Sequence, residues 1–103
     1  MVLKVWPLVM NKTSPEIITR LGNETVEVFC SAYGNTRNMV GTITNLGYPV
    51  PHVVETKEDN LLTVKAKVYE DGTFVCTIRE GKEKVQSASV VEQFHCKLIE
   101  QNH

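Results

Sequence analysis

The chain has 103 residues, close to the commonest size of a single domain. A hydrophobic fraction of 42% and a charged fraction of 22% are typical of a globular chain and exclude the disordered and fibrous classes. The net charge of −1 gives no electrostatic basis for a nucleic-acid partner, so none is expected. No apolar run is long enough to span a membrane. The apolar stretch 2–10 holds Lys4 and Pro7 and lacks the cleavage site of a signal peptide.

Short β-type segments broken by Gly, Pro and Asn follow one another along the chain, at the spacing typical of an all-β sandwich or barrel. Segments 3–10 and 16–20 are candidate edge strands, because Pro7 and Pro15 cannot donate to a strand ladder. Residues 25–32 alternate with period two, which predicts a half-buried strand. Its predicted inward residues are Val26, Val28, Cys30 and Ala32.

The same pattern continues through the second half of the chain. Segment 39–44 is a predicted strand weakened by Gly41, and 52–56 is a short edge strand. Residues 62–69 and 73–79 alternate strongly. The last predicted strand is 84–94, and its pattern leaves the register ambiguous, with Ala88 and Val90 taken as inward. The predicted inward residues of these last three strands are Leu62, Val64, Ala66, Val68, Phe74, Cys76, Ile78, Ala88 and Val90.

Two of the three cysteines, Cys30 and Cys76, fall on inward faces, and the second ends the stretch Glu70-Asp71-Gly72-Thr73-Phe74-Val75-Cys76. This stretch is similar to the D-x-G/A-x-Y-x-C motif at the start of strand F in the immunoglobulin superfamily. The resemblance implies an immunoglobulin-like β-sandwich of two antiparallel sheets with Greek-key topology. It also implies a Cys30–Cys76 disulfide between the sheets. The corner motif becomes Glu70, Asp71, Gly72 and Phe74, with Phe74 in place of the family's tyrosine.

The resemblance covers nearly the whole chain. Its implied strands are A and A′ (7–20), B (25–32), C (39–45), E (61–68), F (73–79) and G (84–94). The short gap between the cysteines favours an I-set or C2-type domain. The strand-C tryptophan of the family is absent, since the only Trp is Trp6, and Ile43 is expected in its place. We expect one domain over 1–103 with its core at about 7–96, and a tail or linker at 97–103 leading to a further domain of a longer extracellular chain.

Closing a loop of about 45 residues, the implied disulfide is worth about 4 kcal/mol in the chain-entropy model. The alternative is a reduced pair in an intracellular domain, as in muscle-type immunoglobulin domains. Cys96 is left over; it is a free thiol, a thiol whose partner lies in a missing part of the parent protein, or the site of an intermolecular disulfide. His95 and Cys96 lack a second ligand pair, so no metal site is expected.

Two sequons, at Asn11 and Asn23, fall at predicted loops or strand edges. The composition predicts about one sequon by chance. Together with the cysteine pair, the sequons favour a glycoprotein at the cell surface or in secretions.

No catalytic or cofactor-binding motif is present, so neither an enzyme nor a cofactor is expected. The three histidines, His52, His95 and His103, are interpreted as surface residues.

The remaining prediction is a binding surface. Outward residues expected on the F and G strands are Thr73, Val75, Thr77, Arg79, Val85, Ser87 and Val91, and Phe29, Tyr69 and Val75 are expected to be exposed. Candidate partner contacts are Tyr33, Arg37, Tyr48, Val75, Thr77 and Arg79.

We therefore expect an extracellular recognition module of a receptor, adhesion or immune-recognition protein. Its partner would be a second copy of the same domain, giving a possible homodimer, or a different protein. The domain itself would not insert into a membrane. The alternatives are a secreted decoy that captures a cytokine or growth factor, and an intracellular muscle-type structural domain.

Overall fold

The computed structural model of the protein describes residues 7–94. The predicted thiol Cys96, its neighbour His95, and the tail 97–103 with His103 therefore lie outside the described residues, as does Trp6. Within residues 7–94 the period-two segments form strands, as their alternation predicts. These strands are β1 (Val9–Thr13), β2 (Ile17–Arg20), β3 (Val26–Tyr33), β4 (Met39–Asn45), β5 (Tyr48–Pro49), β6 (Val54–Glu58), β7 (Leu61–Val68), β8 (Gly72–Glu80) and β9 (Glu83–Gln93), with a short 3-10 turn, η1 (Thr36–Asn38), before β4.

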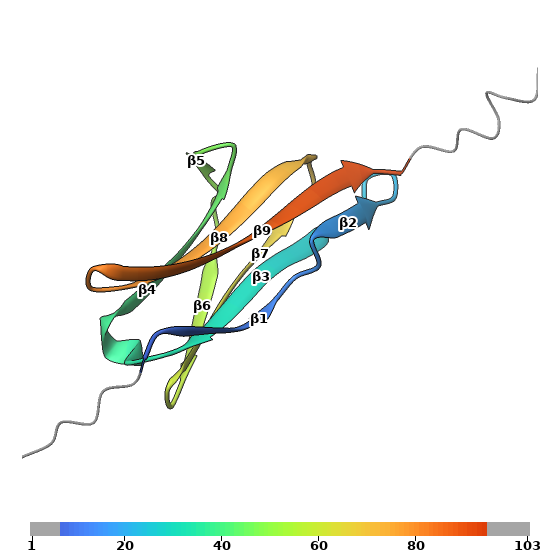
Figure 1. Ribbon diagram of the computed structural model, residues 1–103. Coiled ribbons are helices and arrows are strands. Elements are labelled where there is room, and N and C mark those ends of the chain that lie inside the picture. The colour runs from blue at the N-terminus through green and yellow to red at the C-terminus, as the bar shows by residue number, and fades with distance from the viewer. Residues whose placement is uncertain (1–6, 95–103) are drawn as a thin grey trace, which may run out of the picture.

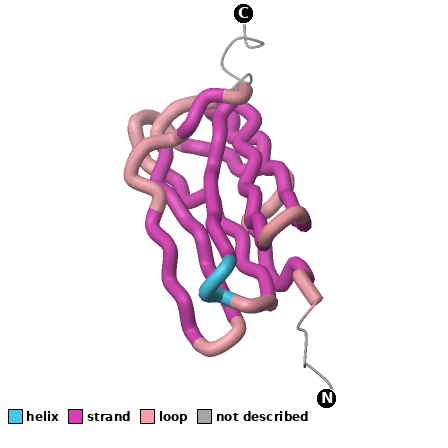
Figure 2. The backbone as a smooth tube through the Cα atoms, turned by 90° about the vertical axis from the view of Figure 1, so that its left-hand side faces the viewer, coloured by secondary structure: helices cyan, strands magenta, loops and turns pink. Residues whose placement is uncertain are grey.

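The strands form two facing sheets, with the orders β1-β3-β7-β6 and β2-β9-β8-β4-β5 (Figure 1). The connections from β3 to β4 and from β7 to β8 cross between the sheets, so the predicted sandwich with Greek-key topology is confirmed. One pairing departs from the expected antiparallel pattern, because β2 runs parallel to β9. The described chain begins and ends at opposite ends of the sandwich (Figure 2).

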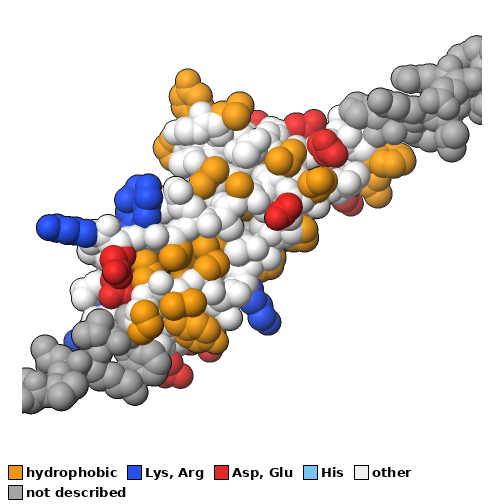
Figure 3. Space-filling model, viewed as in Figure 1, with side chains coloured by type: hydrophobic (Ala, Val, Ile, Leu, Met, Phe, Trp, Pro, Cys, Tyr) orange, Lys and Arg blue, Asp and Glu red, His pale blue; other side chains and the backbone are white. Residues whose placement is uncertain are grey.

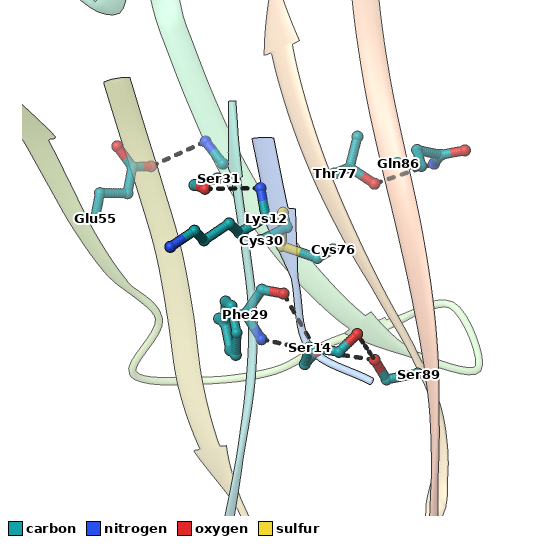
Figure 4. Close-up of a disulfide and its surroundings, with 11 residues drawn as sticks. Lys12, Ser14, Phe29, Cys30, Ser31, Glu55, Cys76, Thr77, Gln86 and Ser89 are labelled. Carbon is teal, nitrogen blue, oxygen red and sulfur yellow. Dashed lines mark hydrogen bonds between the residues drawn. A yellow bond between two sulfur atoms is a disulfide. The ribbon is translucent and has the colours of Figure 1, made fainter. Parts of the chain in front are cut away.

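The chain moves from one sheet to the other between β1 and β2, and Ser14 fixes this crossing. The buried Ser14 hydroxyl donates to the Phe29 carbonyl of β3 at 3.2 Å and accepts from the Phe29 N–H at 3.1 Å. It also lies 2.8 Å from the Ser89 hydroxyl of β9, so one side chain connects both sheets (Figure 4). Because β2 keeps the direction of β1 after this crossing, it meets β9 in parallel orientation.

Cys30 of β3 and Cys76 of β8 form the expected disulfide, with an S–S distance of 2.06 Å and a Cα–Cα distance of 6.0 Å (Figure 4). Both cysteines are buried in a core that contains nearly all the predicted inward residues of β3, β7 and β8, with Val26 half-buried beside it. Ile43, expected at the place of the missing tryptophan, is buried and lies opposite Cys76 in the β4–β8 register.

Gly41 of β4 is buried directly beneath Val64 of the opposite sheet. A Cβ at Gly41 would lie 2.0 Å from the nearest methyl carbon of Val64. The residue that weakens the predicted strand is therefore the one that lets a β7 side chain pack against the β4 backbone.

The predicted register of the last strand is wrong. Ala88 and Val90 of β9 are exposed, whereas Val91 is buried and Val85 and Ser87 are half-buried. The reason is the β8–β9 pairing, in which the inward residues Phe74, Cys76 and Ile78 lie opposite Ser89, Ser87 and Val85. Directly opposite residues share a face, so the buried face of β8 determines that of β9. Ala88 and Val90 are more apolar than Ser87 and Ser89, but the two small serines are the ones that face the core.

The corner motif spans the start of β8. Arg20, at the end of β2, is almost wholly buried, and its guanidinium contacts Asp71 Oδ1 at 3.1 Å and the Gly22 carbonyl at 2.6 Å. The acid that forms the ion pair is therefore Asp71, whereas Glu70 only accepts a long 3.4 Å bond from the Asn45 amide. Phe74 is fully buried, so its ring fills the corner without needing a hydroxyl partner.

Candidate protein-binding surface

The outward face of the five-stranded sheet, which we call the five-strand face, is the candidate functional site. The strand registers place three uncharged rows side by side on it. The rows are Ile17–Val90–Thr73, Ala88–Val75–Thr44–Pro49 and Gln86–Thr77–Thr42. Charged side chains begin only beyond these rows, with Arg79 and Lys84 at one end and Glu92 at the other.

Large apolar side chains on this face are in contact with solvent. Ile17 is 63% exposed and Val40, at the β4 end of the face, is 57% exposed. Val90 is exposed beside Ile17, and Val75 is half-buried in the next row. Figure 3, viewed from the β9 side, shows hydrophobic side chains over the middle of the visible surface and basic side chains gathered at the β8–β9 hairpin end.

The outward face of the other sheet is different in character. Its central strands oppose Glu27 to Lys67 and Phe29 to Lys65 in the β3–β7 register. Phe29, expected to be exposed, is half-buried there. Because charges are depleted at the centre of protein interfaces, the five-strand face is the better candidate for a protein partner.

The predicted contact residues do not form one cluster. Val75 and Arg79 of β8 lie on the five-strand face, whereas Tyr33 ends β3 of the other sheet. Arg37 lies in η1, and Tyr48 in β5 at the sheet edge. All except Val75, which is half-buried, and Thr77 are exposed.

Thr77 faces outward as predicted but is only 6% exposed, because Gln86 of β9 covers it and donates to its hydroxyl at 3.0 Å. The residues expected outward on β9, namely Val85, Ser87 and Val91, face the core instead. The prediction missed Ile17, Val40 and Val90 as exposed residues. Val90 would have been identified as outward-facing by testing both possible registers of β9 against β8, since directly opposite residues share a face.

Within residues 7–94 no group of three or more His, Cys, Asp or Glu side chains gathers in a way that suits a metal ion. The described part of the chain also contains no helix long and apolar enough to cross a membrane.

No protein-family model matches the sequence, and no curated protein matches it. Solved structures, by contrast, are similar in fold. A chain of the complex between Dpr2 Ig1-Ig2 and DIP-Theta Ig1-Ig3 matches with a TM-score of 0.74 and 10% identity over 87% of this chain and 33% of that chain. Rst D1-D2 matches with a TM-score of 0.73 and 15% identity over 87% of this chain and 51% of that chain.

Titin domain M7 matches with a TM-score of 0.68 and 11% identity over 91% of this chain and 100% of that one. The chain thus corresponds to a single titin domain but to about a third of the Dpr2 complex chain and half of the Rst chain. With its two sheets and the Cys30–Cys76 bridge, the described part of the chain has an immunoglobulin-like β-sandwich fold.

Proposed function

We propose that the protein is an extracellular recognition module of a cell-surface receptor or adhesion protein, and that it binds a protein partner through the five-strand face. The observation that carries this proposal is the set of three uncharged rows with exposed Ile17 and Val90. Removal of such apolar area from water, about 25 cal/mol per Å², drives most protein association.

The likeness to a chain of the complex between Dpr2 Ig1-Ig2 and DIP-Theta Ig1-Ig3 supports a protein partner. The disulfide supports an extracellular location, because such bonds are rare in the reducing cytosol. Catalysis is not part of the proposal. The titin likeness favours a second candidate, an intracellular structural domain. Mass spectrometry of the native protein separates the two candidates, since fully reduced Cys30 and Cys76 would support the second.

Binding is tested with Val90→Lys, which places a charge in the middle of the five-strand face. The matched control is Val54→Lys, an exposed valine to lysine change on β6 of the other sheet. Sedimentation equilibrium over a range of concentrations measures self-association, and staining of cells by a fluorescent tetramer of the domain measures a heterophilic partner.

We expect Val90→Lys to abolish whichever signal the wild type gives, while Val54→Lys retains it. Loss of staining after the cells are treated with protease identifies the partner as a protein. Equal signals from the two variants would contradict the use of the five-strand face. A strictly monomeric wild type that stains no cells would contradict the recognition function itself.

A further inference from the structure

A concave site lies next to the β5 edge of the five-strand face, at the end of the sandwich where β4 turns into β5 and β7 leads to β8 (Figure 1). It is a pocket of about 540 Å³, within the usual range for ligand-binding clefts. The buried side chains of Val68 and Phe74 contribute to its lining. Nothing in the proposed recognition role requires this pocket.

Its lining is dominated by rings. Tyr48 of β5 is 76% exposed, and Tyr69, which directly follows β7 of the other sheet, is 71% exposed. Pro49 and Pro51 add two pyrrolidine rings to the lining of the pocket. The lining holds one ammonium group, on Lys67, and one carboxylate, on Glu70, so it does not select a strongly charged ligand.

The backbone at this site is held in unusual conformations. Leu46 has φ 52° and His52 has φ 60°, and both residues line the pocket. Non-glycine residues rarely adopt positive φ, and such strain often occurs at binding sites. Leu46 and Gly47 form the tight turn that directs Tyr48 into β5. The conformation of this turn thus sets the position of the exposed Tyr48 ring.

The segment 49–51 also excludes one mode of binding. The Val50 N–H donates inward to the Ile43 carbonyl at 2.9 Å, and its neighbours Pro49 and Pro51 have no N–H. An incoming β-strand would therefore find no free N–H donor along this wall, so strand addition is not supported here. A ligand of this pocket must be recognised through the side chains.

We propose that this pocket binds a proline-rich segment of a partner protein in the polyproline II conformation. Such segments are recognised in grooves lined by aromatic rings, and they are already extended before binding. Their pyrrolidine rings pack on Tyr48 and Tyr69, and their solvated carbonyl groups accept hydrogen bonds from donors such as the tyrosine hydroxyls. The neutral balance of Lys67 and Glu70 matches an uncharged proline ligand.

The test is an NMR titration of the oxidised 103-residue chain with decaproline, and with (Gly-Ser)₅ as the control peptide. We expect saturable amide shifts confined to residues 45–52 and 67–70 with decaproline and none with the control peptide. Tyr48→Ala or Tyr69→Ala should weaken binding about tenfold, as expected for loss of one aromatic wall.

The chain offers a matched control, because the third tyrosine, Tyr33, is 45% exposed and lies outside the pocket. Tyr33→Ala and Val90→Lys should both leave decaproline binding unchanged, which separates this proposal from the function of the five-strand face. The proposal is overturned by a lack of decaproline binding at millimolar concentration. It is also overturned by equal binding of (Gly-Ser)₅, or by shifts that map elsewhere on the domain.

Discussion

Glu55 of β6 reaches across the open side of the sandwich and accepts a hydrogen bond from the backbone N–H of Gly41 in β4, at 3.0 Å (Figure 4). The two residues belong to different sheets. Among the described residues, β5 pairs with β4 only at Thr44 and Asn45, so the edge of β4 next to Gly41 has no strand beside it. The carboxylate of Glu55 thus pairs with a backbone N–H that would otherwise be free to bond to an added strand at this edge.

We expect Glu55→Ala to lower the free energy of unfolding by about 1 kcal/mol, because a charge-assisted hydrogen bond at a partly solvated site is lost. Urea unfolding followed by circular dichroism measures the change. Glu58→Ala, on the same exposed strand, is the control and should change stability by less than about 0.5 kcal/mol. Equal effects of the two substitutions would contradict a role for the Glu55 contact.

Reduction of the Cys30–Cys76 disulfide should destabilise the domain strongly. The two cysteines are 46 residues apart, and the chain-entropy model gives such a bridge about 4 kcal/mol, with less often observed. We expect the melting temperature to fall by about 10 °C or more when a reductant is added. Calorimetry with and without reductant measures this fall. An unchanged melting temperature would show that the bridge does not stabilise the fold.

Gly41→Ala should cost about 1–3 kcal/mol, because the added methyl group overpacks the core against Val64. Chemical unfolding measures the loss. The double variant Gly41→Ala/Val64→Ala removes the Val64 methyl group that would lie 2.0 Å from the new Cβ and leaves the Val64 Cβ at 3.0 Å. Its loss of stability should therefore be smaller than the sum of the two single losses. Additive effects in this cycle would mean that Gly41 and Val64 are not coupled.

Asp71→Asn should destabilise the protein by about 1–2 kcal/mol, because it removes the charged partner of the buried Arg20 while Asp71 itself is half solvated. Glu70→Gln, one residue away, should have little effect, since Glu70 makes only a long contact with Asn45. Thermal unfolding of the two variants compares them directly. A larger loss from Glu70→Gln would reverse the assignment of the corner acid.

The two sequons should differ when the protein passes through a secretory host. Both asparagines are exposed, and Asn23 lies in the β2–β3 turn. The Asn11 amide nitrogen, the atom that a glycan would modify, donates to the Ser31 hydroxyl at 3.2 Å. We expect the mass removed by glycosidase to disappear in Asn23→Gln and to persist largely in Asn11→Gln. The opposite pattern would show that the Asn11 hydrogen bond does not matter for glycan attachment.

Much of the fold could be predicted because alternation is a local property of the chain. The inward residues Val28, Cys30 and Val64 follow from period two within single strands, and their burial confirms it. The β9 register could not be predicted in this way. Both phases of that strand contain small or apolar residues, and the choice depends on the pairing with β8. The same holds for the candidate site, whose apolar rows join β2, β9, β8, β4 and β5.

The sequence alone determined most of the strands, because each follows from a repeating period, whereas the cysteine pair and the two-sheet class followed from the resemblance of a short motif to the immunoglobulin superfamily. Tertiary structure alone decided that Arg20 pairs with Asp71, that Val64 packs on Gly41, and that Tyr48 and Tyr69 line one pocket. Each of these contacts joins side chains from strands or connections that are distant in sequence. Such contacts depend on how two sheets are registered and packed, and no local pattern records that choice.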